Sequence, residues 1–213
     1  MTTVKQIQYT TTNSYMTLNE LGPKTKYLWL VFHGMGYLSK YFIRYFDGLD
    51  PEQHRIIAPQ APSKYYQDNT YKHVGASWLT REDTKQETKN VLAYVDAVYQ
   101  AEFPSHCNLI VLGYSQGVSI ATRWLAHSKV SCQRLILHSG GIPTELRADQ
   151  FDFLPKECPV DYVYGTDDPY INEARVELES AKGTTLFGDR LSLHAFEGAH
   201  EVNRAFILDS YKM

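Results

Sequence analysis

Short apolar runs alternate with longer stretches of helical periodicity along this chain. The apolar runs cover residues 27–32, 55–58, 108–112, 134–137, 160–164 and 191–196. Several of them lack polar alternation, which is typical of strands that are covered on both faces. The stretches with helical periodicity cover residues 39–49, 81–101, 116–127, 169–181 and 201–211. Strands that alternate with helices predict an α/β domain with right-handed crossovers and a mostly parallel sheet.

The first twenty residues carry a different pattern. Residues 4–10 and 14–18 alternate apolar and polar positions, and polar Thr11, Thr12 and Asn13 join them. A period of two is typical of strands with one face in solvent, so we expect an antiparallel hairpin at the edge of the sheet. No internal repeat or long linker interrupts the chain, so we expect one domain over residues 1–213.

Composition narrows the class of protein. Hydrophobic residues make up 43% and charged residues 21%, as in an ordinary globular chain. The formal net charge of −3 gives no reason to expect a nucleic-acid partner or an anionic membrane surface. No run is long and apolar enough to predict a membrane span, and the N-terminus does not have the pattern of a signal peptide. We expect a monomer or a small homo-oligomer.

The cysteines indicate the compartment. Cys107, Cys132 and Cys158 are odd in number and lack the Cys-x-x-Cys spacing. They therefore argue against a disulfide framework and a cysteine zinc site. A reducing compartment fits them better, and we expect the protein to be cytoplasmic.

Ligand sites in parallel sheets lie beyond the carboxyl ends of the strands, so the residues that follow each apolar run matter most. Run 108–112 is followed by Gly113-Tyr114-Ser115-Gln116-Gly117. This is a Gly-x-Ser-x-Gly pattern between a strand and a helix, which predicts a nucleophile elbow with Ser115 at its tip. The small glycines allow the sharp turn that exposes the serine hydroxyl.

A serine nucleophile needs a base, and the base needs an acid to orient it. His200 follows the last apolar run on a loop of small residues and is the candidate base. His138 ends a strand and is a distant rival, whereas His194 lies within a strand and suits packing. Asp167 and Asp168 both follow run 160–164, and either can cap the next helix instead. Asp168 is the favoured acid, and the chain order Ser, Asp, His matches that of hydrolases whose serine lies on such an elbow.

Backbone amides complete the predicted site. The N–H of the residue after the nucleophile, Gln116, is one expected oxyanion donor. Met35, in His33-Gly34-Met35-Gly36 directly after run 27–32, is the expected second donor. His33 has no second ligand at metal spacing, so we expect no metal. Catalysis by a serine, a histidine and an acid needs no cofactor, so we expect none.

These motifs together resemble the phospholipase/carboxylesterase branch of the α/β-hydrolases, which includes the acyl-protein thioesterases. The resemblance runs from about Leu28 to Arg204. It includes the oxyanion loop (residues 32–36), the elbow (113–117), the acid loop (165–168) and the base loop (198–200). Two further segments narrow the choice of family, Ala58-Pro59-Gln60-Ala61-Pro62 and Ser139-Gly140-Gly141-Ile142-Pro143. The resemblance implies an α/β-hydrolase fold and favours Asp168 as the acid.

The chain departs from the pattern of that family near the expected pocket. Tyr37 stands where the family often has Asp, Tyr164 where it often has His, and Thr80 where it usually has an acidic residue. Tyrosine is abundant, with 16 residues. We expect Tyr37, Tyr65, Tyr66 and Trp78 to line the substrate pocket, since aromatic rings with polar tips suit an acyl or aryl group near water. The long 60–80 segment is a candidate lid or pocket wall, and we expect an open, shallow pocket.

The sequence therefore predicts a serine hydrolase that cleaves small carboxylic esters, with thioesters and lysophospholipids as further candidates. Two alternatives stay open at this point. One is a binding protein of the same fold that holds a small molecule without turnover. The other is an amidase or peptidase that uses the same three residues.

Overall fold

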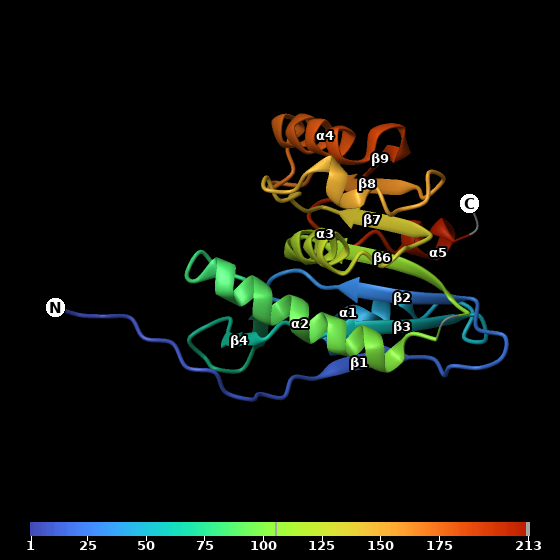
Figure 1. Ribbon diagram of the computed structural model, residues 1–213. Helices are drawn as coiled ribbons and strands as arrows, with labels where there is room; N and C mark the ends of the chain where they lie inside the picture. Colours follow the sequence, from blue (N-terminus) through green and yellow to red (C-terminus); the bar gives the residue numbers. More distant parts are fainter. Residues whose placement is uncertain (105, 212–213) are drawn as a thin grey trace.

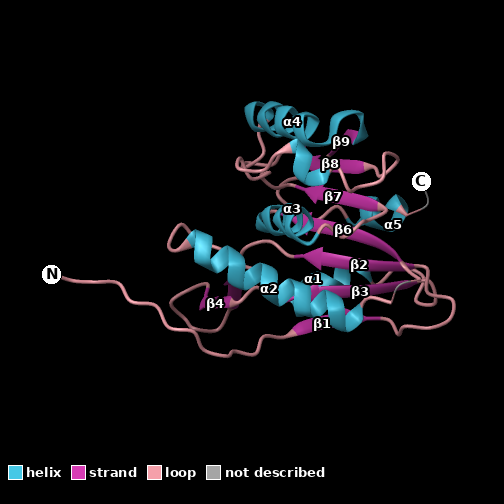
Figure 2. Ribbon diagram, viewed as in Figure 1, coloured by secondary structure: helices cyan, strands magenta, loops and turns pink. Residues whose placement is uncertain are grey.

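The computed structural model describes residues 1–104 and 106–211. Within these residues, seven strands form one sheet in the order β1-β3-β2-β6-β7-β8-β9 (Figures 1 and 2). These strands are β1 (Tyr15–Leu18), β2 (Tyr27–Phe32), β3 (His54–Pro59), β6 (Asn108–Tyr114), β7 (Arg134–His138), β8 (Val160–Gly165) and β9 (Leu191–Phe196). All six strands expected from the apolar runs are present, with ends that differ by at most two residues.

The helices also follow the predicted stretches. The α-helices are α1 (Ser39–Phe42), α2 (Thr84–Glu102), α3 (Gln116–Ser128), α4 (Glu173–Phe187) and α5 (Arg204–Ser210). Short 3₁₀ segments are η1 (Ile43–Phe46), η2 (Ala148–Phe151) and η3 (Gly188–Arg190). Helix α4 begins four residues later than expected, at Glu173, where the Asn172 side chain accepts a hydrogen bond from the Arg175 N–H. None of the helices in the described part of the chain is long and apolar enough to cross a membrane.

The sheet is parallel except at one edge. There β1 runs antiparallel to β3, with Tyr15 opposite Pro59. The expected antiparallel edge strand is therefore present, but the expected hairpin is wrong, because residues 4–10 form no strand. These residues lead away from the domain (Figure 1), and Val4 and Ile7 are exposed. They have no apolar surface to cover, whereas residues 15–18 pair with the open edge of β3.

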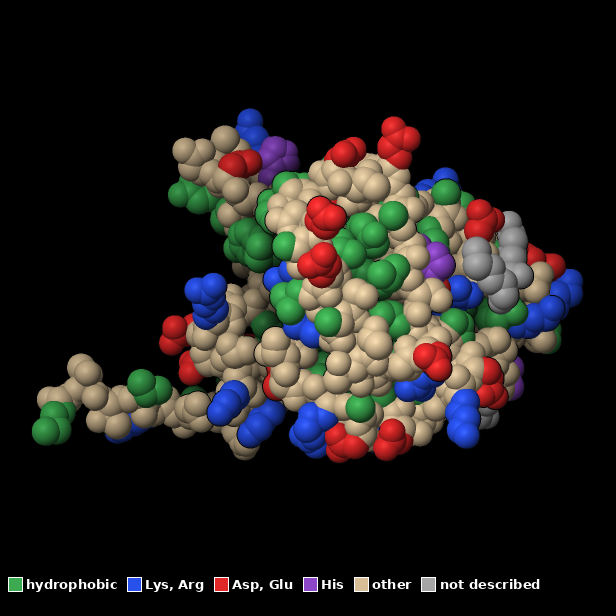
Figure 3. Space-filling view, turned by 90° about the horizontal axis from the view of Figure 1, so that it is seen from above, with side chains coloured by type: hydrophobic (Ala, Val, Ile, Leu, Met, Phe, Trp, Pro, Cys, Tyr) green, Lys and Arg blue, Asp and Glu red, His purple; other side chains and the backbone are tan. Residues whose placement is uncertain are grey.

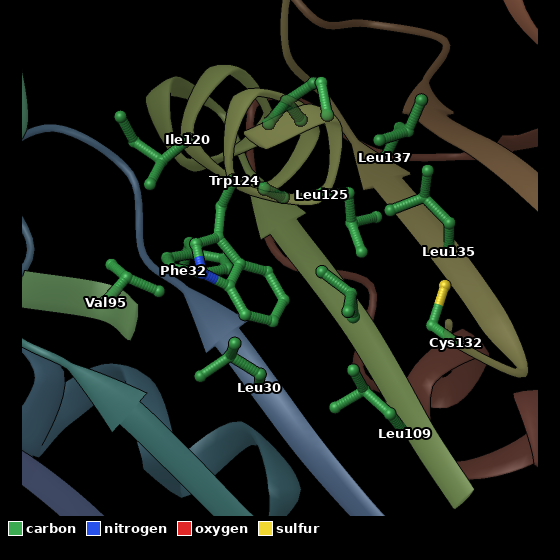
Figure 4. Packing of buried hydrophobic residues seen from close by; sticks show 14 of the residues in the cluster. Leu30, Phe32, Val95, Leu109, Ile120, Trp124, Leu125, Cys132, Leu135 and Leu137 are labelled. Carbon is green, nitrogen blue, oxygen red and sulfur yellow. The ribbon is translucent and has the colours of Figure 1, made fainter. Parts of the chain in front are cut away.

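Each face of the sheet carries its own apolar layer, and alternate side chains of β2 divide between them. Leu28, Leu30 and Phe32 belong to the apolar layer that α2, α3 and α4 cover, whereas Trp29 and Val31 belong to the layer on the other face, which α1, η1 and α5 cover. Figure 4 shows Trp124 of α3 directed onto β2 beside Leu30 and Phe32. This two-sided burial explains why the strands read as unbroken apolar runs.

Strand register places the carboxyl ends of the parallel strands at one edge of the sheet. Phe32 lies opposite Gly113, Tyr114 opposite His138, and Gly165 opposite Phe196. The loops that follow β2, β6, β7, β8 and β9 therefore meet on the left in Figure 1. In Figure 3 the outline of the molecule is hollowed on this left side, below a projecting part.

The 60–80 segment is more ordered than its sequence indicates. It contains a separate antiparallel hairpin of β4 (Ser63–Tyr66) and β5 (Val74–Ser77). Every side chain of β4 is exposed, so this strand lacks the alternation by which a half-buried strand is recognised.

Candidate active site

Ser115 occupies a strained turn between β6 and α3. Its φ of 52° and ψ of −119° lie in a region that L-residues rarely adopt, and its backbone N–H donates to the His138 carbonyl at 2.8 Å. The flanking glycines are required by space. A Cβ on Gly117 would lie 2.1 Å from the Phe32 carbonyl oxygen, and one on Gly113 would lie 2.5 Å from the Gly117 oxygen. The turn therefore has the geometry of a nucleophile elbow.

Ser115, His200 and Asp168 lie in hydrogen-bond contact, although they are far apart in the chain. His200 Nε2 is 3.0 Å from Ser115 Oγ, and His200 Nδ1 is 2.7 Å from Asp168 Oδ2. The Asp168 side chain has no exposed surface, whereas that of His200 is 20% exposed. Since a buried carboxylate accepts hydrogen bonds, it favours the tautomer that carries the proton on Nδ1 and leaves Nε2 free to accept from the serine.

The two acidic residues after β8 differ in their surroundings. The other carboxylate oxygen of Asp168, Oδ1, accepts hydrogen bonds from the backbone N–H groups of Tyr170 and Ile171 at 2.8 and 3.1 Å. Asp167 is exposed, and its backbone N–H donates to the Gly198 carbonyl at 2.9 Å. The structure thus brings Asp168, and not Asp167, to His200.

His200 and the loop that carries it are held by residues to which the sequence assigned no such role. The Tyr114 hydroxyl donates to the His200 carbonyl at 2.9 Å, and the Tyr170 ring lies 4.9 Å from the His200 ring between centroids. His138 Nε2 accepts from the Asn203 N–H at 2.8 Å, just after the base loop. Burial lowers the pKa of His138 to about 3, so this imidazole is a neutral acceptor at pH 7. In the sequence, the signal for these contacts was Tyr114, the aromatic residue inside the elbow motif.

Two backbone amides face no protein acceptor beside Ser115. Among the described residues, neither the Met35 nor the Gln116 N–H donates a hydrogen bond to a protein group. A Cβ on Gly34 would lie 3.0 Å from Ser115 Cβ, which places the loop of Met35 against the elbow. Free N–H groups in this position are the type of donor that stabilises an oxyanion.

His33 holds the loop that carries Met35. Its Nε2 accepts from the Ala61 N–H at 3.1 Å, so the proton lies on Nδ1, which donates to the Gly34 carbonyl at 2.8 Å. Burial lowers the pKa of His33 to about 4 and keeps it neutral at pH 7. Because the carbonyl and the N–H of a trans peptide point in opposite directions, this bond also orients the Met35 N–H.

Trp78 takes a different place from the one expected. It has no exposed surface, so the expectation that it lines the substrate pocket is corrected. Its ring packs edge-on against Phe32, and its Nε1–H donates to the His33 carbonyl at 2.8 Å. The Gln116 side chain accepts from the Trp78 N–H at 2.8 Å and donates to the Leu79 carbonyl at 2.7 Å. Trp78 therefore belongs to the support beneath the oxyanion loop.

The tyrosines expected at the pocket lie at different depths. Tyr65 and Tyr66 are exposed on β4, and the Tyr65 hydroxyl lies 3.8 Å from where a Cβ on Gly36 would be. Tyr37 is partly buried, with its hydroxyl 3.3 Å from that of Tyr45, and burial raises its pKa. The β4–β5 hairpin binds the oxyanion loop directly, since the Gly36 N–H donates to the Ala76 carbonyl at 2.9 Å.

Among the described residues, no group of three or more His, Cys, Asp or Glu side chains has the arrangement of a metal site. His33 uses both ring nitrogens in hydrogen bonds to the backbone. The arrangement of Ser115, His200 and Asp168 can activate the serine hydroxyl, and two free backbone N–H groups lie beside it.

Comparisons with solved structures agree on the fold. Acyl-protein thioesterase 2 from Zea mays superposes with a TM-score of 0.72 over 94% of this chain and 96% of its own, at 15% identity. Esterase PE8 gives 0.67 over 93% and 95% of the two chains at 20% identity. A phospholipase/carboxylesterase from Dyadobacter fermentans gives 0.62 over 90% of each chain at 21% identity. The predicted α/β-hydrolase fold is confirmed.

Sequence comparison identifies the family. No protein with curated annotation matches this chain. The family model described as Phospholipase/Carboxylesterase, by contrast, matches residues 18–212, which is most of the chain. The resemblance found in the motifs is therefore confirmed, and the chain belongs to the phospholipase/carboxylesterase family of α/β-hydrolases.

Proposed function

We propose that this protein is a serine hydrolase that cleaves small carboxylic esters through Ser115, His200 and Asp168. The observation that carries the proposal is the unbroken chain of contacts from Ser115 Oγ to His200 at 3.0 Å and on to Asp168 at 2.7 Å. The free amides of Met35 and Gln116 beside it support the same reading. Membership of a carboxylesterase family is consistent with this chemistry.

The chemistry proceeds through an acyl-enzyme. His200 Nε2 takes the Ser115 proton as the oxygen attacks the ester carbonyl, and Asp168 stabilises the resulting imidazolium. The Met35 and Gln116 N–H groups donate to the tetrahedral oxyanion. His200 then protonates the leaving oxygen as the carbon–oxygen bond breaks. A water molecule, deprotonated by His200, releases the acid and restores Ser115.

The substrate is proposed to be a short-chain ester bound at an open site. Met35 is 61% exposed, and Tyr65 and Tyr66 are exposed on the hairpin beside it. A cavity of about 860 Å³ lies elsewhere, at the amino ends of the strands, where Tyr27 and Arg134 line it. Thioesters and lysophospholipids are further candidates for the site at Ser115.

The three cysteines are free in the described part of the chain, which supports a reducing, cytoplasmic location.

A fluorophosphonate probe tests the enzyme against the non-catalytic binding protein. We expect wild-type protein to be labelled, and Ser115→Ala to lose labelling while keeping its circular dichroism spectrum. Equal labelling of both proteins would contradict the role of Ser115, and an unlabelled wild type would favour the binding protein.

A panel of p-nitrophenyl esters and anilides then tests the substrate class. We expect turnover of acetate and butyrate esters, with little activity on long-chain esters or anilides. Turnover of long-chain esters alone would refute the short-chain proposal. Faster cleavage of anilides would point to an amidase.

A further inference from the structure

One aromatic side chain is both exposed and in contact with the proposed base. Tyr170 is 71% exposed, and its ring lies 4.9 Å from the His200 ring between centroids, at an interplanar angle of 73°. Tyr114 also contacts the His200 ring, at 5.4 Å, but it is only 2% exposed. Of these two rings, only that of Tyr170 offers a surface to a molecule arriving from solvent.

Asp168 holds the backbone of Tyr170. Its N–H donates to Asp168 Oδ1 at 2.8 Å, and the same oxygen accepts from Ile171 at 3.1 Å. The Asp168 carboxylate therefore orients His200 with one oxygen and holds the Tyr170 backbone with the other. These bonds restrict the Tyr170 backbone, and the contact with the His200 ring restricts the side chain. A side chain that is already restricted loses less conformational entropy when a ligand packs against it.

The reaction assigns a role to this place. In acylation the Ser115 oxygen bonds to the acyl carbon, the bond from that carbon to the leaving oxygen breaks, and the proton on His200 Nε2 passes to the leaving oxygen. The group attached to that oxygen must then lie beside the His200 ring. We propose, on the basis of the function proposed above, that Tyr170 forms the leaving-group subsite and that this subsite selects esters of aromatic alcohols.

Charge around the subsite narrows the ligand further. Asp167 is exposed next to Asp168, and the Glu201 carboxylate lies 2.6 Å from where a Cβ on Gly198 would be, on the base loop. These carboxylates disfavour an anionic leaving group close to His200. The subsite therefore suits a neutral ring, which packs against tyrosine by its apolar face and edge.

Two acetate esters test the inference, because they share an acyl group and differ in the leaving group. One is phenyl acetate, and the other is a fluorinated alkyl acetate whose alcohol is about as acidic as phenol. For Tyr170→Ala we expect kcat/KM to fall about 3- to 10-fold with phenyl acetate, the range of an aromatic pair, and less than about 2-fold with the alkyl ester. Tyr170→Phe keeps the ring and should keep the wild-type preference. Tyr41→Ala, which removes an exposed tyrosine on α1, is the matched control.

A second measurement separates a binding role from a structural one. Both esters form the same acetyl-enzyme, and the alcohol has departed before the acetyl-enzyme is hydrolysed. Tyr170→Ala should therefore leave the deacylation rate unchanged. A fluorophosphonate expels fluoride, which has no ring, so its labelling rate should also be unchanged. Equal losses with both esters, or slower deacylation, would overturn the subsite and indicate that Tyr170 only supports Asp168. A wild-type protein that neither cleaves the esters nor reacts with the probe would instead refute the proposed function.

Discussion

Replacement of Asp168 by Asn is the sharpest test of the proposed chemistry. The Oδ1 atom still accepts from the Tyr170 and Ile171 N–H groups, so we expect the fold to be retained. The amide nitrogen, however, takes the place of Oδ2 and donates to His200 Nδ1. The imidazole proton then moves to Nε2, where it faces Ser115 and prevents His200 from acting as the base.

The size of the effect follows from the contact. Asp168 Oδ2 lies 2.7 Å from His200 Nδ1, and the carboxylate is wholly buried. For charge centres about 4 Å apart and an effective dielectric constant of about 20, the attraction to the imidazolium is about 4 kcal/mol, or about 10³ in rate. The inverted tautomer adds to this, so we expect kcat to fall by about 10³ to 10⁴ with a small change in KM.

The assay is hydrolysis of p-nitrophenyl acetate by Asp168→Asn, with circular dichroism as the control for folding. Asp167→Asn is the matched variant, because the neighbouring carboxylate is exposed and has no contact with His200. It should retain nearly all activity. A folded Asp168→Asn that keeps more than about a tenth of wild-type kcat, or an equal loss in Asp167→Asn, would refute the reasoning.

Three further predictions concern stability. In urea denaturation, Gly117→Ala should lower the free energy of unfolding by more than about 3 kcal/mol, because its Cβ would lie 2.1 Å from a carbonyl oxygen. Gly22→Ala is the control and should be neutral or stabilising, because no atom lies within 4 Å of its Cβ. Similar midpoints for the two variants would contradict the close packing of the elbow. The pKa of His138 is lowered to about 3 in the folded state, so the unfolded state binds more protons below about pH 6.5 and stability falls toward pH 4. His138→Gln should make that slope shallower by up to about 1.4 kcal/mol per pH unit, and an unaltered slope would show that His138 is not the group responsible. Asp161→Ala should lower the free energy of unfolding by about 3–5 kcal/mol, because it leaves the buried Arg134, which donates to Asp161 at 2.6 Å, without that partner. The double variant Arg134→Met, Asp161→Leu, measured by the same denaturation, should lose less stability if the unpaired charge is the cause, and as much or more if lost packing is the cause.

Much of the fold could be predicted because apolar periodicity is a local property. Strands covered on both faces need an apolar residue at every position, and this requirement is visible in the chain from Tyr27 to Phe32 without knowledge of any partner. The exceptions are segments whose residue pattern does not reveal whether they pair with another strand. Strand β4 is exposed throughout, and residues 4–10 alternate like a strand but have nothing to cover.

The candidate site divides in the same way. The sequence by itself determined that Ser115 follows one strand, His200 another, and an acidic pair a third, and topology requires such strand ends to meet at one edge of a parallel sheet. The sequence favoured Asp168 over Asp167, but only the tertiary structure shows that Asp168 is the one in contact with His200. Only the tertiary structure moved Trp78 from the pocket into the support of the oxyanion loop and put the Tyr170 ring against His200. The reason is that neighbouring residues in a loop differ little in sequence pattern, whereas the direction of these side chains is set by contacts with residues about 30 or more positions away, such as Asp168 with His200 and Trp78 with His33.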